Sequence, residues 1–143
     1  KTTILDAQGL KDLVKNGDKP LLINFWATWC GPCRTEFPDL VRIDKEYRGE
    51  GLDFVIVSID NVSLADTAVS DFLKSYDAEM PSYLLDAEER REITGALRGI
   101  APRFTGGFPS TMLFNRSGRL VYLKNGVIND GILRIQIDKV LKK

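Results

Sequence analysis

The sequence predicts an α/β fold in which a mixed central sheet carries helices on both faces and is completed by a C-terminal β-hairpin and a helix. Apolar runs of strand length at 21–26 and 52–59 alternate with longer segments of helical periodicity. Near the C-terminus, two apolar runs flank the turn-forming residues Asn115–Gly118, which indicates an antiparallel pair of strands. A length of 143 residues without a repeat or a linker predicts a single domain over residues 1–143.

The first elements follow from caps, breakers and apolar runs. Residues 6–17 have a helical pattern, and Asp6 is placed to cap that helix. Residues 21–26 form an apolar run that is too short for a helix, so we expect a buried strand. A helix is expected from residue 30 to about residue 48, with a kink near Pro38 because proline removes a backbone hydrogen bond.

The middle of the chain predicts a second buried strand and a helix. Residues 52–59 include an uncharged run, Phe54–Val57, that is typical of a strand covered on both faces. Ser63 or Asp66 can open the next helix. The inner face of that helix is expected to hold Ala65, Val69, Phe72, Leu73 and Tyr76.

The remaining elements include a short strand, two helices and the hairpin. Residues 82–85 suit a brief strand, and Asp86 with Glu89 resembles a capping box that opens a helix to about residue 98. After a glycine- and proline-containing stretch, strands are expected at 110–114 and 119–123, followed by a helix at 130–141. We expect the inward face of that last helix to include Ile132, Ile135 and Val140.

Composition excludes several classes of protein. Lys plus Arg equals Asp plus Glu at 20 each, so no excess of positive charge points to nucleic acid. The absence of histidine excludes catalysis through a histidine base and metal sites built on histidine. No apolar stretch approaches the ~18 residues of a membrane span. Because the chain begins at Lys1 rather than Met, we expect that an upstream segment such as a signal peptide or an anchor was removed.

The two cysteines, Cys30 and Cys33, carry the chemistry that the sequence predicts. They follow a buried strand directly and open a helix, whose N-terminus offers free N–H groups and a partial positive charge. A thiolate placed there is stabilised, so the pKa of the cysteine drops below its free value of roughly 8.5. We expect Cys30 to be exposed and Cys33 to lie one turn inside the helix. Such a pair can attack a disulfide and resolve the mixed disulfide internally.

Three simpler interpretations compete with a redox role for Cys30 and Cys33. A structural disulfide closing so short a loop would stabilise the fold by only about 2 kcal/mol. Half of a zinc site would need two more Cys or His ligands, which the chain does not contain. Buried, inert cysteines fit poorly with the flanking Gly31 and Pro32 at a strand–helix junction.

The stretch Phe25-Trp26-Ala27-Thr28-Trp29-Cys30-Gly31-Pro32-Cys33 resembles the active-site signature of the thioredoxin superfamily. Pro38 matches the kink in that family's active-site helix. Phe108-Pro109-Ser110-Thr111, just before a strand of the hairpin, matches its cis-proline loop. The order of elements agrees over essentially the whole chain, so the resemblance implies a thioredoxin fold and a cis bond before Pro109.

Two departures from ordinary thioredoxins narrow the resemblance. Asn24 stands where thioredoxins keep a buried Asp, and the neighbouring strand lacks their Lys. We expect Asn24 to hydrogen-bond backbone where the strand meets the turn. Glu36 follows Cys33 by three residues, a pattern that resembles the extracytoplasmic TlpA/ResA-like branch. Its members are exported bacterial proteins, often membrane-anchored, that reduce disulfides during cytochrome c maturation or related thiol metabolism.

The resemblance implies a role for each residue of the site. Cys30 attacks, Cys33 resolves, and Glu36 handles protons, although a carboxylate there could equally complement the positive end of the helix. We expect the substrate surface to comprise Trp29, Gly31, Pro32, Phe108 and Pro109.

The cysteine pair and the resemblance together predict a protein disulfide reductase that needs no cofactor or metal, and the resemblance implies that it works outside the cytoplasm. Its expected partners are a disulfide-containing protein and an upstream dithiol electron donor such as a membrane thiol transporter. Nucleic acid is not expected, and the protein is expected to be a monomer. Two alternatives remain open: a thiol peroxidase of the same fold, and a non-catalytic binding module such as a copper chaperone.

Overall fold

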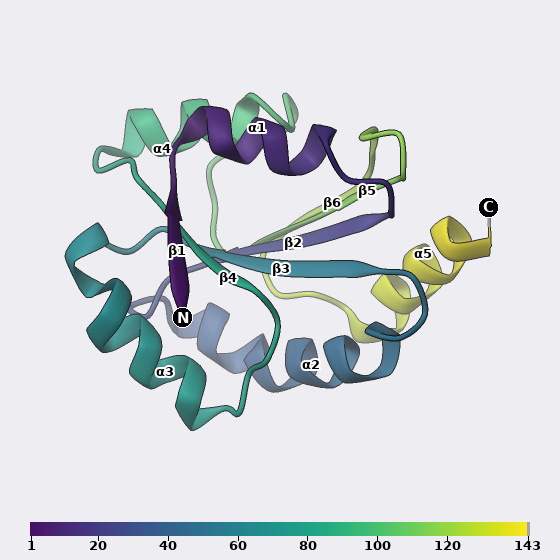
Figure 1. The fold of residues 1–143 in the computed structure, drawn as a ribbon, viewed down its shortest axis with the longest axis horizontal. Helices are drawn as coiled ribbons and strands as arrows, with labels where there is room; N and C mark the ends of the chain where they lie inside the picture. The colour runs from purple at the N-terminus through teal and green to yellow at the C-terminus, as the bar shows by residue number, and fades with distance from the viewer. Residues whose placement is uncertain (143) are drawn as a thin grey trace.

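The computed structural model describes residues 1–142 and shows one six-stranded sheet between two layers of helices (Figure 1). The strands are β1 (Thr2–Leu5), β2 (Leu21–Trp26), β3 (Asp53–Ser58), β4 (Ser82–Leu85), β5 (Ser110–Phe114) and β6 (Leu120–Asn125). The α-helices are α1 (Ala7–Lys15), α2 (Gly31–Tyr47), α3 (Ser70–Ser75), α4 (Arg90–Arg98) and α5 (Asp130–Lys142). None of the helices in this described part is long and apolar enough to cross a membrane.

The sheet is mixed, with strand order β1-β4-β3-β2-β5-β6. The pairs β1–β4, β4–β3 and β3–β2 are parallel, whereas β2–β5 and β5–β6 are antiparallel. All six residues of β2 are buried, because this strand lies in the middle of the sheet between two layers of helices. In its register, Asn24 lies opposite Thr111, and Phe25 lies opposite Ser110.

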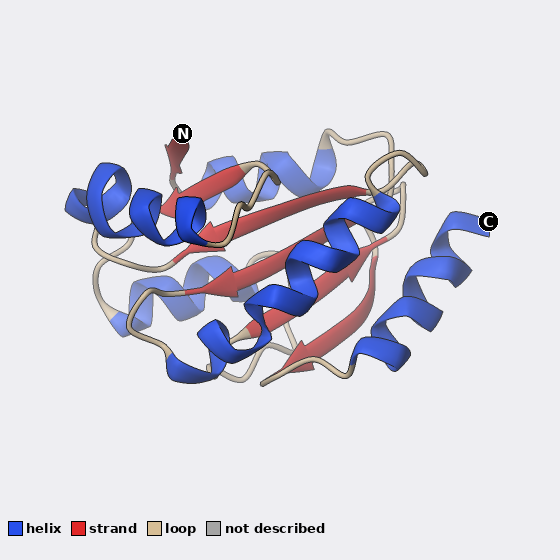
Figure 2. Cartoon of the chain, turned by 90° about the horizontal axis from the view of Figure 1, so that it is seen from below, coloured by secondary structure: helices blue, strands red, loops and turns tan. Residues whose placement is uncertain are grey.

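The two faces of the sheet carry separate cores. Helices α1 and α4 cover one face, and α2, α3 and α5 cover the other (Figures 1 and 2). Buried side chains of β2 alternate between them, because Leu22 and Trp26 pack toward α2 while Ile23 and Phe25 pack toward α1 and α4. This alternation is the ordinary period of a strand, and it fixes which residues of β2 face the helix that begins at the cysteines.

Strand β1 was not expected from the sequence. It pairs in parallel with β4 at the edge of the sheet, and Thr2 lies opposite Ser82. The expected capping box of Asp86 and Glu89 is wrong, because the hydrogen bonding between β1 and the chain after β4 extends to Asp86. The backbone N–H of Asp86 still donates to Leu5, so the chain remains extended there. Helix α4 instead begins at Arg90 with Glu89 as its cap, and the backbone N–H of Glu89 donates to the carboxylate of Glu92.

The inward face of α5 also differs from the prediction. Leu133 and Ile137 are buried, whereas Ile132 and Ile135 are 48% and 55% exposed. Side chains four residues apart share one face of a helix, so a face centred on Leu133 and Ile137 turns both isoleucines outward. Val140 packs against the core as expected.

The helix expected to begin near Ser63 or Asp66 is irregular at its start. A 3-10 turn, η1 (Val62–Leu64), leads into a π-helical turn, η2 (Ala65–Val69), before α3 continues it. Phe72 and Tyr76, from the expected inner face, pack edge-to-face against Phe37 of α2, and Phe72 also contacts Trp26 of β2. These aromatic rings pack the region beneath the N-terminal half of α2.

Candidate active site

Helix α2 begins at the cysteine pair, one short turn after β2 ends. Cys30 is the N-cap residue of the helix, and its Sγ accepts the backbone N–H of Cys33 at 3.3 Å. The two cysteines form a disulfide, with 5.3 Å between their Cα atoms. A sulfur atom therefore occupies the position in which a capping oxygen usually satisfies the first free N–H groups of a helix.

The expectation of an exposed Cys30 is wrong for this disulfide-bonded state. Cys30 is only 6% exposed and Cys33 only 1% exposed, although the order of accessibility is as expected. The exposed residues are their neighbours Trp29, Gly31 and Pro32. The structure therefore presents the disulfide beneath a rim formed by the residues that flank the two cysteines in sequence.

Glu36 lies one turn beyond Cys33 on the same side of α2 and is 1% exposed. Its Oε1 accepts the backbone N–H of Ile128 at 2.9 Å, and its Oε2 accepts the side-chain amide of Asn24 at 2.9 Å. Burial raises the pKa of this carboxyl above its ordinary value, and the hydrogen bonds from Ile128 and Asn24 offset part of that rise. Glu36 is thus a buried carboxyl tied to β2 and to the loop before α5, not a solvated charge near a helix end.

The expectation that Asn24 bonds to backbone is wrong. Its Nδ2 donates to Glu36 and also to the hydroxyl of Thr111 at 3.0 Å, because the register of β2 and β5 sets Asn24 opposite Thr111. The Oδ1 atom of Asn24 is buried and has no protein partner among the described residues. Asn24 therefore belongs to a polar cluster with Glu36 and Thr111 beneath α2.

Asp60 is a residue that the sequence analysis did not identify. It follows β3, is 1% exposed, and accepts both the backbone N–H of Thr28 at 3.0 Å and its hydroxyl at 2.7 Å. The hydroxyl of Ser58 donates to the same carboxylate at 2.6 Å. Asp60 thereby fixes the turn that carries Trp29 and Cys30. A usable signal was that Asp60 is the first charged residue after the uncharged run 54–59, at the edge of the sheet where the ends of the parallel strands meet.

The Phe108–Pro109 peptide bond is cis, as the resemblance implied. Pro109 is buried and immediately precedes β5, whose Ser110 pairs with Phe25 near the end of β2. Strand pairing therefore brings this loop to the same end of β2 from which the cysteine turn departs. The carbonyl of Pro109 accepts the N–H of Gly126 at 2.7 Å. Because Gly126 directly follows β6, this hydrogen bond ties the cis-proline loop to the end of that strand.

A groove of about 350 Å³ adjoins the cysteine turn, between that turn and α4. Trp29, which is 67% exposed, and the half-buried Phe108 contribute to its walls. Trp26, by contrast, is fully buried in the core. The groove is lined by Trp29, Ile59, Asn61, Glu88, Arg90, Ile93, Thr94, Gly106 and Phe108.

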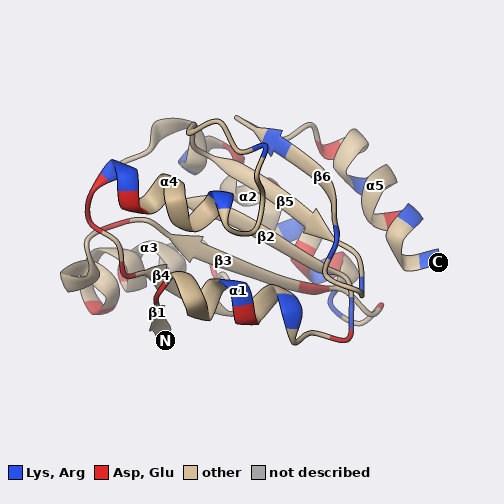
Figure 3. Ribbon diagram, turned by 90° about the horizontal axis from the view of Figure 1, so that it is seen from above, with Lys and Arg blue, Asp and Glu red and all other residues tan. Residues whose placement is uncertain are grey.

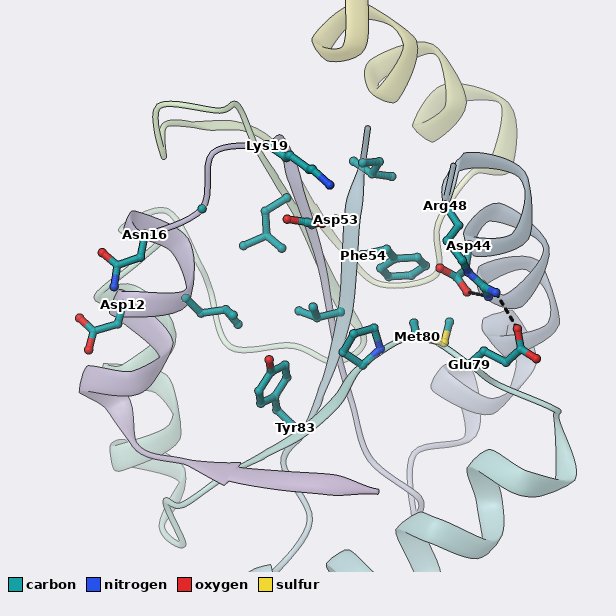
Figure 4. A pocket seen from close by; sticks show the side chains of 16 residues that line it. Asp12, Asn16, Lys19, Asp44, Arg48, Asp53, Phe54, Glu79, Met80 and Tyr83 are labelled. Atoms are coloured by element: carbon teal, nitrogen blue, oxygen red, sulfur yellow. Dashed lines mark hydrogen bonds and ion pairs between the residues drawn. The ribbon is translucent and has the colours of Figure 1, made fainter. Parts of the chain in front are cut away.

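A second concavity, of about 550 Å³, lies at the opposite end of the central strands (Figure 4). It surrounds the beginnings of β2 and β3, and its walls include Phe54 and Tyr83. On one side Arg48 is paired with Asp44 and with Glu79, the latter at 2.6 Å. None of the residues proposed for the redox site lines this concavity.

Comparison with known proteins identifies the family. Residues 3–141 match the Redoxin family. The chain is 32% identical to the thiol-disulfide oxidoreductase ResA of Bacillus subtilis over 115 residues, covering 80% of this chain and 58% of that protein. It is 27% identical to ResA of Bacillus thuringiensis subsp. konkukian over 141 residues, covering 98% of this chain and 72% of the relative. The chain spans little more than half of several relatives it matches, 58% of ResA from Bacillus subtilis and 56% of ResA from Bacillus cereus.

Solved structures agree with the architecture. A Chlorobium tepidum protein described as a thiol:disulfide interchange protein DsbE superposes with a TM-score of 0.68 at 27% identity, covering 87% of this chain and 82% of that one. StoA from Bacillus subtilis superposes with a TM-score of 0.66 at 23% identity, covering 85% and 84%. These likenesses confirm the expected thioredoxin fold. The chain therefore belongs to the Redoxin family, and within that family it is similar to the ResA thiol-disulfide oxidoreductases.

Proposed function

We propose that this protein is a thiol–disulfide oxidoreductase that reduces protein disulfides through Cys30 and Cys33. The observation that carries the proposal is the Cys30–Cys33 disulfide at the N-terminus of α2, with the buried carboxyl of Glu36 one turn further along. The likeness to relatives named thiol-disulfide oxidoreductases supports it.

The reduced pair acts in two steps. The thiolate of Cys30 attacks one sulfur of the substrate disulfide, forming a mixed disulfide and releasing the other substrate sulfur as a thiolate. Cys33 then loses its proton and attacks the sulfur of Cys30, which releases the second substrate thiol and leaves the Cys30–Cys33 disulfide. Two electrons have moved to the substrate, and an upstream dithiol restores the pair. The N–H of Cys33, which bonds to the sulfur of Cys30, stabilises a thiolate there.

Glu36 is proposed to accept the proton from Cys33. That thiol is sheltered, so water is poorly placed to deprotonate it. A carboxyl with a raised pKa is better matched to a thiol than an ordinary surface carboxyl, which would remain ionised. Its raised pKa also reduces the repulsion that a fixed negative charge would exert on the Cys33 thiolate.

The substrate is proposed to approach over Trp29, Gly31 and Pro32 on one side and Phe108 and Pro109 on the other. Trp29, Gly31 and Pro32 are exposed, and the half-buried Phe108 lines the adjoining groove with Trp29, which supports this role. Pro109 is buried, so its part would be to shape the loop that carries Phe108. Gly31 is informative because a Cβ built there meets no atom within 4 Å, so the space above it is open to a partner.

We further propose that the protein works outside the cytoplasm as a monomer, without a cofactor, and that its electron donor is a dithiol protein such as a membrane thiol transporter. Cytochrome c maturation is one such setting. The resemblance to the TlpA/ResA-like branch supports this placement. Fusion of the full-length protein to alkaline phosphatase tests it: an active fusion is expected, and an inactive one, with the protein recovered in the cytosol, would overturn it.

Insulin reduction by dithiothreitol tests the activity. Wild type is expected to accelerate the reaction, Cys30→Ser to abolish the acceleration, and Cys33→Ser to accumulate a mixed disulfide through Cys30. Asp53→Asn, an exposed substitution at the beginning of β3 and so at the opposite end of the central strands from the cysteines, is the control and should behave as wild type. No acceleration by the wild-type protein, or faster alkylation of Cys33 than of Cys30, would contradict the proposal.

A further inference from the structure

One face of α4 concentrates positive charge beside the substrate groove. Arg90, Arg91 and Arg98 are exposed, and together with Thr94 and Gly95 they line a shallow hollow of about 550 Å³. We call this the α4 arginine face. Its lining contains no carboxylate. Figure 3 shows basic positions at both ends of this helix.

The arginines of this face are not neutralised within the protein. In the described residues 1–142, no ion pair joins any of the three to a carboxylate. The acids near these arginines in sequence make other contacts or lie outside the hollow. Glu89, directly before Arg90, is the N-cap residue of α4 and does not line the hollow. The carboxylate of Glu92 accepts the backbone N–H groups of Glu88 and Glu89, and Glu88 itself lines the groove rather than the arginine face.

Arg98 is held in place by the loop that leads to the cis-proline. Its Nε donates to the carbonyl of Phe104 at 3.0 Å, which leaves the terminal nitrogens of the guanidinium free to bind. A fixed guanidinium loses less side-chain entropy when it binds a carboxylate than a mobile one does.

The arginine face and the substrate groove are continuous. Arg90 and Thr94 line both hollows, so a chain that lies against Trp29 and Phe108 can continue along α4 toward Arg98. From Arg90 to Arg98 the helix rises by roughly 12 Å, which an extended peptide spans with about four residues.

We propose that the α4 arginine face docks an acidic segment of about four residues in the disulfide-bearing polypeptide, next to the part of that polypeptide that lies in the substrate groove. This inference rests on the proposed function and names the chemistry of the substrate. Asp or Glu side chains suit it because guanidinium groups bind carboxylates through paired hydrogen bonds. Opposite charge also accelerates encounter, an effect that weakens as salt screens it.

The test uses three peptides, each with one internal disulfide followed by four residues that are all acidic, all Gln or all Lys. For the wild-type protein we expect kcat/KM to be about tenfold higher for the acidic than for the Gln peptide at low salt. The Lys peptide should react more slowly than the Gln peptide, and the differences should shrink at high salt.

Two double variants test whether the preference for the acidic peptide arises from the α4 arginine face. Arg90→Gln/Arg91→Gln is expected to reduce the preference for the acidic peptide to about twofold. Arg116→Gln/Arg119→Gln removes two exposed arginines that likewise form no ion pair within residues 1–142 but lie at the far end of β5, and it should keep the full preference.

Each alternative result is decisive. Equal rates for the acidic and Gln peptides would overturn the docking proposal and leave the proposed function standing. An equal loss of preference in both double variants would also overturn it, because the effect would then be one of overall charge. If no peptide is reduced, the proposed function fails and the docking proposal fails with it.

Discussion

Asn24 donates its side-chain amide to the carboxylate of Glu36, although the two residues lie on different elements, β2 and α2. Ordinary thioredoxins place an acid in the strand position of Asn24. Here the acid comes from the helix, and the strand supplies an uncharged donor. The protonation state of this site is therefore controlled by one carboxyl, whose pKa burial raises and Asn24 lowers.

The first prediction concerns Asn24→Ala. Removing the amide leaves the carboxylate of Glu36 with one fewer donor, so the pKa of Glu36 should rise further. We expect a loss of about 1–3 kcal/mol in the free energy of unfolding, larger at pH 8 than at pH 4, measured by urea denaturation. Thr111→Val is the control, because it leaves the bond from Asn24 to Glu36 in place and should cost the same at both pH values.

The second prediction concerns Glu36→Gln. Since the pKa of Glu36 is raised in the folded protein, the folded state holds its proton more tightly than the unfolded state does. Its contribution to stability is therefore greatest below the ordinary value of 4.5 and declines as the pH rises through the folded value. In Glu36→Gln this decline should disappear, and the pH profile of Cys33 alkylation should shift. Superimposable profiles in the two proteins would leave Glu36 without a proton-transfer role.

The third prediction concerns the anchoring of the cysteine turn by Asp60. Asp60→Ala leaves the N–H of Thr28 without its acceptor, so we expect a loss of about 1–3 kcal/mol. Because the same contact fixes Trp29 and Cys30, the rate of insulin reduction by the folded fraction should also fall. Asp71→Ala, on the exposed side of α3, provides the control. An unchanged rate would show that the turn holds its geometry without Asp60.

The fourth prediction concerns Gly31→Ala. The added methyl group meets no atom of the protein within 4 Å, so the melting temperature should stay close to that of the wild type. Any reduction in kcat/KM for insulin would then come from contact with the substrate. An unchanged kcat/KM would remove Gly31 from the proposed substrate surface.

The fifth prediction concerns the two sides of α5. Leu133→Ala should cost about 2–5 kcal/mol because Leu133 is fully buried against the sheet. Ile132→Ala, one residue earlier but 48% exposed, should change stability by less than about 0.5 kcal/mol. Similar losses in both variants would mean that the helix packs in a different rotation.

The sequence was most informative where local chemistry is strong. The apolar runs of β2 and β3, the turn after Phe114 and the Cys30–Cys33 spacing each specify their own structure. The order of elements from α1 onward and the position of the cysteines at the start of a helix were therefore predicted correctly. Strand β1 has little buried surface and depends on β4, about 80 residues away, so no local pattern indicated it.

Contacts between distant residues set the rest of the site. Asn24 meets Glu36 because of how α2 rotates on the sheet, and meets Thr111 because of the register of β5. The backbone N–H that Glu36 accepts comes from Ile128, 92 residues further along the chain. The rotation of α5 was predicted wrongly for a related reason. Apolar side chains lie on more than one face of this helix, so its sequence alone did not show which face is buried against the sheet.

The sulfur of Cys30 caps the helix that carries Cys33, and this has a consequence for the proposed catalytic cycle. Opening the disulfide does not remove the acceptor of the Cys33 N–H, because a Cys30 thiolate in the same place accepts it more strongly. The disulfide closes so short a loop that it adds only about 2 kcal/mol to the free energy of unfolding. The protein can therefore alternate between its two redox states while the helix stays nucleated at the same residue, so turnover need not disturb the scaffold that makes it possible.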